Sequence, residues 1–199
     1  MKANENPAPG LPRTGTSMMM QLLAAGGVPV LTDDHRPADA GNTRGYFEHQ
    51  AAKGLRNDST WVAQARGQAV KLVAQLIPHL PPGERYRIIM LHRPLDEVVA
   101  SQRKLLERLD KAGGRTSDEA LRRTFARQVG QVRSLLLALR RRGVLDILDV
   151  HYHDALSDPA GVAERVAAFL GSDAFDAKAA AGVVEPALRH EGVDAEAAA

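Results

Sequence analysis

Short apolar runs and longer helical repeats alternate along most of the chain. The runs lie at residues 69–73, 87–91 and 145–150, and each has the length of a buried strand. Helical patterns follow the first two runs. This order is typical of βαβ units, so the pattern predicts an α/β fold with a parallel sheet.

Four segments repeat apolar residues at helical spacing, at about 17–25, 95–111, 117–142 and 159–170. In the third, apolar side chains recur every three or four residues. It ends in three arginines and Gly143, which suits the negative end of a helix. The fourth segment has Asp158 and Pro159 at its start, where a capping side chain and proline are favoured.

Composition changes this picture little. The chain has 199 residues, 44% hydrophobic and 25% charged, which suits one domain over residues 1–199. Residues 1–9 are expected to be irregular and residues 194–199 to form a disordered tail. A net charge of +2 argues against a nucleic-acid coat, and the lack of cysteine excludes disulfides. No apolar run reaches membrane-spanning length and no secretory signal is evident, so we expect a cytoplasmic protein.

The segment Gly10–Ser17 has the pattern of a glycine-containing turn that opens a helix. Gly10 and Gly15 let the backbone approach a ligand, and the first N–H groups of a helix attract phosphate. The spacing matches that of nucleotide-cleaving enzymes, but Thr16 replaces their lysine and Arg13 is the nearest cation. The alternative is a turn that binds no ligand.

A second candidate anion site follows the run at residues 87–91. Arg93 stands at the expected strand end, where its fork could hold a phosphate through two hydrogen bonds. Ser101 lies about two helical turns further on, and its hydroxyl could add a donor. The alternative is an ordinary strand-to-helix turn with a surface arginine.

Together these two elements resemble the sulfotransferases that use 3′-phosphoadenosine 5′-phosphosulfate (PAPS). Gly10–Ser17 is similar to their 5′-phosphosulfate loop, and Arg93 with Ser101 to their 3′-phosphate element. Residues 42–48, 150–159 and 184–189 resemble further segments of bacterial members, in the same order. The resemblance implies a three-layer α/β/α fold with a central parallel sheet, like that of P-loop nucleoside triphosphate hydrolases.

The resemblance also assigns roles to residues. It implies that Arg13 stabilises the leaving oxygen and that the rest of the loop cradles the 5′-phosphate, namely Gly10, Thr14, Gly15, Thr16 and Ser17. Lys71 lies in an apolar run, where an unpaired lysine is costly, and resembles the strand lysine near the sulfuryl group.

The usual histidine base is absent from its expected place two residues after Lys71, where Val73 stands. Glu48 resembles the glutamate base of other sulfotransferase branches; its alternative role is that of a first-turn helix residue. His35, His49 and His79 are weaker candidates for the base. His151 and His153 are expected to alternate at a strand end, and we expect no metal.

The chain departs from the resemblance at its start. The phosphate loop should follow an apolar strand, yet Pro7 and Pro9 precede it and no apolar run exists. The first strand is therefore expected to be weak or missing, which would weaken donor binding. An ATP-dependent small-molecule kinase and a catalytically degenerate nucleotide-binding or scaffold protein remain alternatives. We expect the acceptor to be a small molecule or saccharide with a hydroxyl or amine, whose identity no motif indicates, and the oligomeric state is open.

Overall fold

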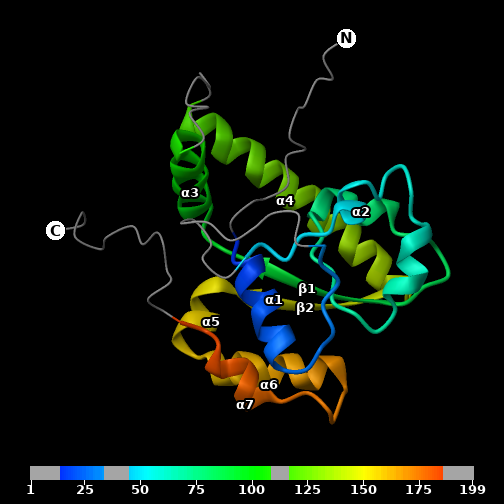
Figure 1. The fold of residues 1–199 in the computed structure, drawn as a ribbon. Coiled ribbons are helices and arrows are strands. Elements are labelled where there is room, and N and C mark those ends of the chain that lie inside the picture. Colours follow the sequence, from blue (N-terminus) through cyan, green and yellow to red (C-terminus); the bar gives the residue numbers. More distant parts are fainter. Residues whose placement is uncertain (1–13, 34–44, 109–116, 186–199) are drawn as a thin grey trace.

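The computed structural model describes residues 14–33, 45–108 and 117–185 (Figure 1). The expectations for residues 1–9 and 194–199 lie outside these ranges, as do those for Gly10, Arg13 and His35. The elements in chain order are α1 (Thr16–Ala25), α2 (Gln50–Lys53), η1 (Thr60–Ala65), η2 (Ala74–His79), β1 (Tyr86–His92), α3 (Leu95–Arg108), α4 (Asp118–Arg141), β2 (Leu145–His151), α5 (Tyr152–Ser157), α6 (Pro159–Leu170) and α7 (Ala177–Gly182).

The strands β1 and β2 pair in parallel, from Tyr86 opposite Leu145 to His92 opposite His151. They confirm the strands predicted at residues 87–91 and 145–150. The predicted parallel sheet is therefore present, with two strands among the described residues.

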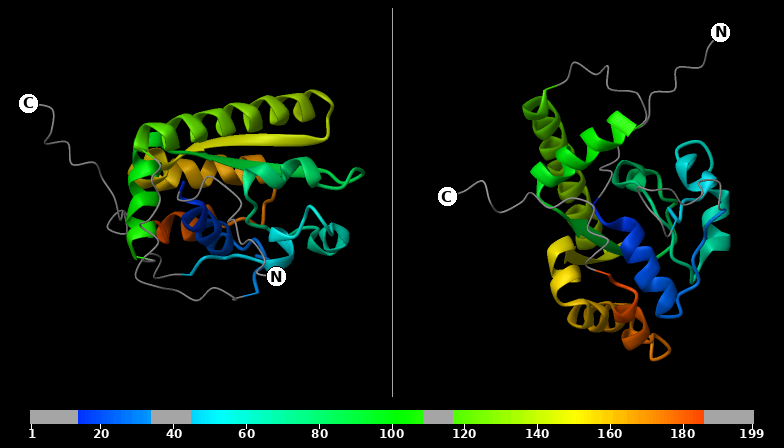
Figure 2. Two further views of the ribbon diagram at one scale, coloured as in Figure 1. Left: turned by 90° about the horizontal axis from the view of Figure 1, so that it is seen from above. Right: turned by 60° about the vertical axis from the view of Figure 1, so that its left-hand side comes forward.

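Helices cover both faces of this sheet. Side chains alternate across a strand, so successive residues of β1 and β2 pack into opposite layers. Ile89, Leu91, Leu148 and Val150 pack with α1, α6 and α7. Ile88, Met90 and Ile147 face the other way and pack with η2 and α4. The left view of Figure 2 shows the strands between α4 and the layer of α1 and α6. The three-layer α/β architecture predicted from the sequence is thus confirmed.

The four predicted helices are present as α1, α3, α4 and α6, and α3 can be followed as far as Arg108. The Ser117 hydroxyl accepts a hydrogen bond from the Ala120 N–H at the start of α4. Asp158 accepts from the Gly161 N–H at the start of α6, which confirms the predicted acidic cap. No helix of the described ranges is both long and apolar enough to cross a membrane.

The strand predicted at residues 69–73 is wrong in extent. Ala69 forms one parallel bridge with Val30, and the residues after it run on without strand pairing until η2 begins at Ala74. A strand persists where its backbone groups pair along its length. Residues 70–73 instead border a large cavity, which residues of β1 also line.

Candidate functional site

The start of α1 has the geometry of an anion-binding turn. Gly15 precedes the helix with φ of 93°, a left-handed conformation that favours glycine. A Cβ atom at Gly15 would lie 2.6 Å from Cδ2 of Tyr152, so the position also has no room for a side chain. No acidic residue occupies the first turn of α1. Its N–H groups therefore present positive potential without a carboxylate that would compete with a ligand.

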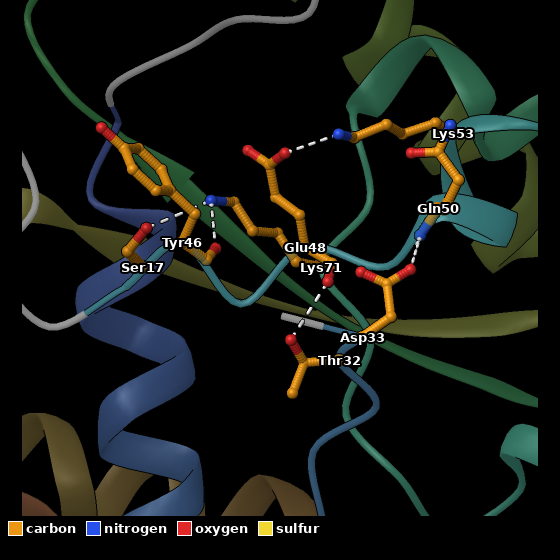
Figure 3. A network of polar contacts seen from close by, with 8 residues as sticks. All are labelled: Ser17, Thr32, Asp33, Tyr46, Glu48, Gln50, Lys53 and Lys71. Carbon is orange, nitrogen blue, oxygen red and sulfur yellow. Dashed lines mark hydrogen bonds and ion pairs between the residues drawn. The ribbon is translucent and has the colours of Figure 1, made fainter. Parts of the chain in front are cut away.

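Lys71 brings a cation to this turn. Its Nζ donates to the Ser17 Oγ at 3.1 Å and to the Tyr46 carbonyl at 2.8 Å (Figure 3). The same Nζ lies 5.8 Å from the centre of the Tyr46 ring. These contacts offset the cost of placing a lysine in an apolar segment. Lys71 therefore contacts Ser17, a residue of the predicted loop, directly.

In Figure 3 the Glu48 carboxylate lies near the Lys71 side chain, on the side away from Ser17. Its Oε2 forms an ion pair with Lys53 Nζ at 2.7 Å. Glu48 lies two residues before α2, which begins at Gln50 and has His49 as its N-cap. Its backbone carbonyl accepts hydrogen bonds from Thr32 Oγ1 at 3.1 Å and from the Asp33 N–H at 3.3 Å. The segment 32–33 thus fixes the backbone from which Glu48 projects.

A strained residue stands between these two polar groups. Phe47 has φ of 51°, in a region that bulky side chains seldom adopt. Its ring packs against the core that α1 shares with the sheet. The strain is retained because the flanking residues are held on both sides, Tyr46 by Lys71 and Glu48 by Thr32. Such strain is found most often at functional sites.

Arg93 directly follows β1 and contacts the side chains of Glu97 and Tyr152. Its Nε donates to Glu97 Oε2 at 2.8 Å, and its guanidinium lies 4.4 Å from the centre of the Tyr152 ring. The other carboxylate oxygen of Glu97 contacts His153 Nε2 at 2.8 Å. The side chains of Arg93 and Glu97 are only 6% and 9% exposed. Arg93 is therefore a buried, oriented cation and not the surface arginine of the alternative interpretation.

The charges around Glu97 set its protonation. Burial alone would raise the pKa of its carboxyl, but hydrogen bonds from Arg93 and His153, together with their charges, lower the pKa below its ordinary value. Glu97 is thus a carboxylate at neutral pH and balances the charge of Arg93.

Tyr152 joins the two candidate anion sites. Its ring lies beside Gly15, at the start of α1, and also beside the guanidinium of Arg93. Tyr152 itself is 7% exposed and begins α5, directly after β2. The two elements that the sequence separates by about eighty residues therefore lie on either side of one aromatic ring.

One cavity of about 1150 Å³ connects these residues. Its lining includes Thr14, Gly15, Thr16, Ser17, Glu48, Lys71, Arg93 and Tyr152. Ser101 is fully buried in α3, and the described residues that line the cavity do not include it. His49 and Trp61 also line it, with ring centres 5.8 Å apart. The part of the chain described here has no cluster of three or more histidines, aspartates or glutamates able to hold a metal ion.

Sequence reasoning missed Glu97 and Tyr152 and misplaced His153. The signal for Glu97 was present, since a carboxylate four residues after an arginine pairs with it on a helix. His153 lies in α5, while His151 ends β2, so the prediction that both alternate at a strand end is wrong. The chain turns into a helix at Tyr152, which rotates His153 toward Glu97.

Comparison with known proteins bears on this geometry. Residues 84–177 match the model of the sulfotransferase family. The resemblance to sulfotransferases is confirmed. The matched segment begins just before β1 and ends at the start of α7, so it contains Arg93, Glu97 and Tyr152. The phosphate loop, Glu48 and Lys71 precede it. The match supports a transferase that moves a sulfuryl group. No curated protein and no solved structure matches the chain significantly.

Proposed function

We propose that this protein transfers a sulfuryl group from PAPS to a hydroxyl or amine of a small-molecule or saccharide acceptor. One observation carries the proposal: the helix start at Gly15 and the buried Arg93 lie on either side of Tyr152 and line one cavity. A nucleotide with separate 3′- and 5′-phosphates has one anionic group for each site. Two anion sites on one cavity favour such a donor over ATP, whose phosphates form a single chain.

The residues present fit this donor. Gly15 lets the start of α1 lie close to the Tyr152 ring, and the N–H groups of Thr16 and Ser17 suit a 5′-phosphate. Lys71 adds positive charge beside Ser17, and Arg93 is assigned to the 3′-phosphate. Gly10, Arg13 and Thr14 keep the donor-binding roles that the resemblance implies. Ser101 is fully buried and does not line the cavity, so the proposal assigns it no contact with the donor. When bound, PAPS supplies an activated sulfuryl group.

The transfer requires positive charge near the leaving oxygen and a base that accepts the proton of the acceptor. Sulfuryl transfer resembles phosphoryl transfer, in which catalysis comes mainly from alignment and charge stabilisation. Lys71, with Arg13, is assigned to the charge that develops on the leaving oxygen. Glu48 is assigned the role of the base that takes the proton from the acceptor. Its partner Lys53 is 53% exposed, and an ion pair this open to water is weak enough to exchange for an acceptor.

Calorimetric titration with adenosine 3′,5′-bisphosphate tests the donor. We expect binding that weakens at least tenfold in Arg93→Lys, which keeps the charge but loses the planar fork. Arg133→Ala is the control, because it removes a cation from the exposed face of α4. Thermal unfolding of each variant shows that the fold is kept. No binding of the bisphosphate, or tighter binding of ATP with magnesium, would overturn the proposal.

Turnover with radiolabelled PAPS and a panel of hydroxyl and amine acceptors tests catalysis. Glu48→Gln should lower kcat at least a hundredfold while leaving the bisphosphate affinity within twofold. Retained donor binding without transfer to any acceptor would favour the non-catalytic nucleotide-binding alternative.

A further inference from the structure

Two consecutive residues at the start of α5 contact Arg93 or its partner. The Arg93 guanidinium lies over the ring of Tyr152, 4.4 Å from the ring centre. The next residue, His153, contacts Glu97 Oε1 through Nε2 at 2.8 Å. Glu97 Oε2 in turn accepts a hydrogen bond from Arg93 Nε at 2.8 Å. The place of α5 therefore bears on the guanidinium twice, directly through Tyr152 and indirectly through His153.

Glu97 divides its two carboxylate oxygens between these partners. Because the pKa of Glu97 is lowered, its carboxyl is ionised at neutral pH, and His153 Nε2 must carry the proton of their contact. Each oxygen then accepts a hydrogen bond to a charged group, which is stronger than a neutral one. The carboxylate cannot turn away from Arg93 without losing the bond from His153. Its orientation thus depends on His153.

The contact between Glu97 and His153 lies behind Arg93 as seen from the cavity. Arg93 and Tyr152 line the cavity, but of the residues described, neither Glu97 nor His153 belongs to that lining. Exposure of the side chains falls from 41% at His153 to 9% at Glu97 and 6% at Arg93. The contacts lead from the surface to a buried cation, so an effect of His153 on a bound ligand acts through Arg93.

We propose that His153 is a positioning residue, which sets the selectivity of the site for a 3′-phosphate by orienting Arg93 through Glu97. The inference rests on the proposed function, in which Arg93 binds that phosphate. A guanidinium forms two parallel hydrogen bonds to a phosphate only when its plane has the right direction. Glu97 fixes the Nε side of this plane. A binding group keeps its geometry when neighbouring side chains hold it in place, and His153 holds Glu97.

Calorimetry with two nucleotides tests the role of His153. The ratio of the affinities for adenosine 3′,5′-bisphosphate and adenosine 5′-monophosphate measures what the 3′-phosphate contributes. His153→Leu removes the N–H that holds Glu97, and we expect the ratio to fall at least tenfold while the monophosphate affinity stays within threefold. His153→Gln keeps an N–H near the place of Nε2 and should restore the ratio to within threefold of the parent. A purely structural role would lower both affinities together.

Two further variants separate the possible causes. His151→Leu is the matched control, since His151 is exposed at the end of β2 and its side chain does not cap α5; the ratio should stay within twofold. Adding His153→Leu to Arg93→Lys should lower the ratio no further, because the effect passes through Arg93. Should His153→Leu fail to fold by thermal unfolding, His153→Asn replaces it, with an amide too short to reach Glu97.

Three results would overturn the inference. They are an unchanged ratio in His153→Leu, a ratio in His153→Gln as low as in His153→Leu, and a further loss in the double variant, which would show that His153 contacts the nucleotide itself. Failure of the proposed function is seen in the parent alone. A parent that binds the bisphosphate no more tightly than the monophosphate refutes the assignment of Arg93, and the inference is refuted with it.

Discussion

Replacing Glu97 tests whether a buried carboxylate holds Arg93 in place. Glu97 joins two partners, Arg93 and His153, each at 2.8 Å, and its side chain is 9% exposed. In Glu97→Gln the amide oxygen still accepts one hydrogen bond, but the charge is lost. A charged hydrogen bond contributes ~1 kcal/mol more than a neutral one, so two of them amount to a loss of ~2 kcal/mol.

Glu97→Leu is the more severe change, because it leaves the buried Arg93 without its carboxylate. Removing one partner of a buried ion pair costs ~3–5 kcal/mol. For a chain of this size, 1 kcal/mol shifts the Tm by ~2–4 °C. We therefore expect Tm to fall by ~4–8 °C in Glu97→Gln and by ~6–20 °C in Glu97→Leu. Glu164→Gln, on the exposed face of α6, should stay within ~0.5 kcal/mol of the parent.

The pH dependence gives an independent check. Because the pKa of Glu97 is lowered on folding, its contribution to stability is complete above the unfolded value of 4.5 and is lost as pH falls through the folded value. The gap in the free energy of unfolding between the parent and Glu97→Gln, measured by chemical denaturation, should shrink below pH 4.5. An equal Tm for Glu97→Gln and Glu164→Gln at pH 7, or a gap that is constant down to pH 3, would refute this account.

Three further substitutions test other contacts. Gly15→Ala should weaken bisphosphate binding at least tenfold by calorimetry and lower stability by ~1–3 kcal/mol, because its φ is positive and its Cβ would meet Tyr152; unchanged affinity would contradict the assigned turn. Lys71→Met should lower kcat at least a hundredfold in the labelled-donor assay, with native-like thermal unfolding as the control. Gly26→Ala should cost ~1–3 kcal/mol, since its Cβ would lie 2.1 Å from the Phe175 ring if nothing moved. Adding Phe175→Leu should recover part of that loss, and a purely additive result would show that the ring moves aside.

Periodicity predicted most of the regular structure. Four helices and two strands follow from apolar spacing, since each is long or fully buried and packs its apolar face into the core. The extended segment 69–73 could not be judged this way, because an apolar run becomes a strand only when neighbours pair with its backbone. The chain offers Val30 on one side and a cavity on the other.

The candidate site was predictable where local rules apply. A glycine at a helix start and an arginine at a strand end are visible in the sequence, and both lie where expected. Their shared proximity to Tyr152 was not predictable, because Tyr152 belongs to neither motif and reaches them through the pairing of β2 with β1. The role of His153 depended on where β2 ends, a boundary that sequence patterns fix poorly.

The position of Tyr152 has a consequence for ligand selection. In the proposed donor site, the Tyr152 ring is close to both Gly15 and the Arg93 guanidinium, so it influences the spacing of the two assigned phosphate sites. The proposed site would therefore select ligands by the distance between two phosphate groups and not by their total charge. A ligand whose phosphates are adjacent is therefore expected to occupy one of the two assigned sites. On this basis, selectivity among nucleotides would come in part from the position of an uncharged aromatic ring.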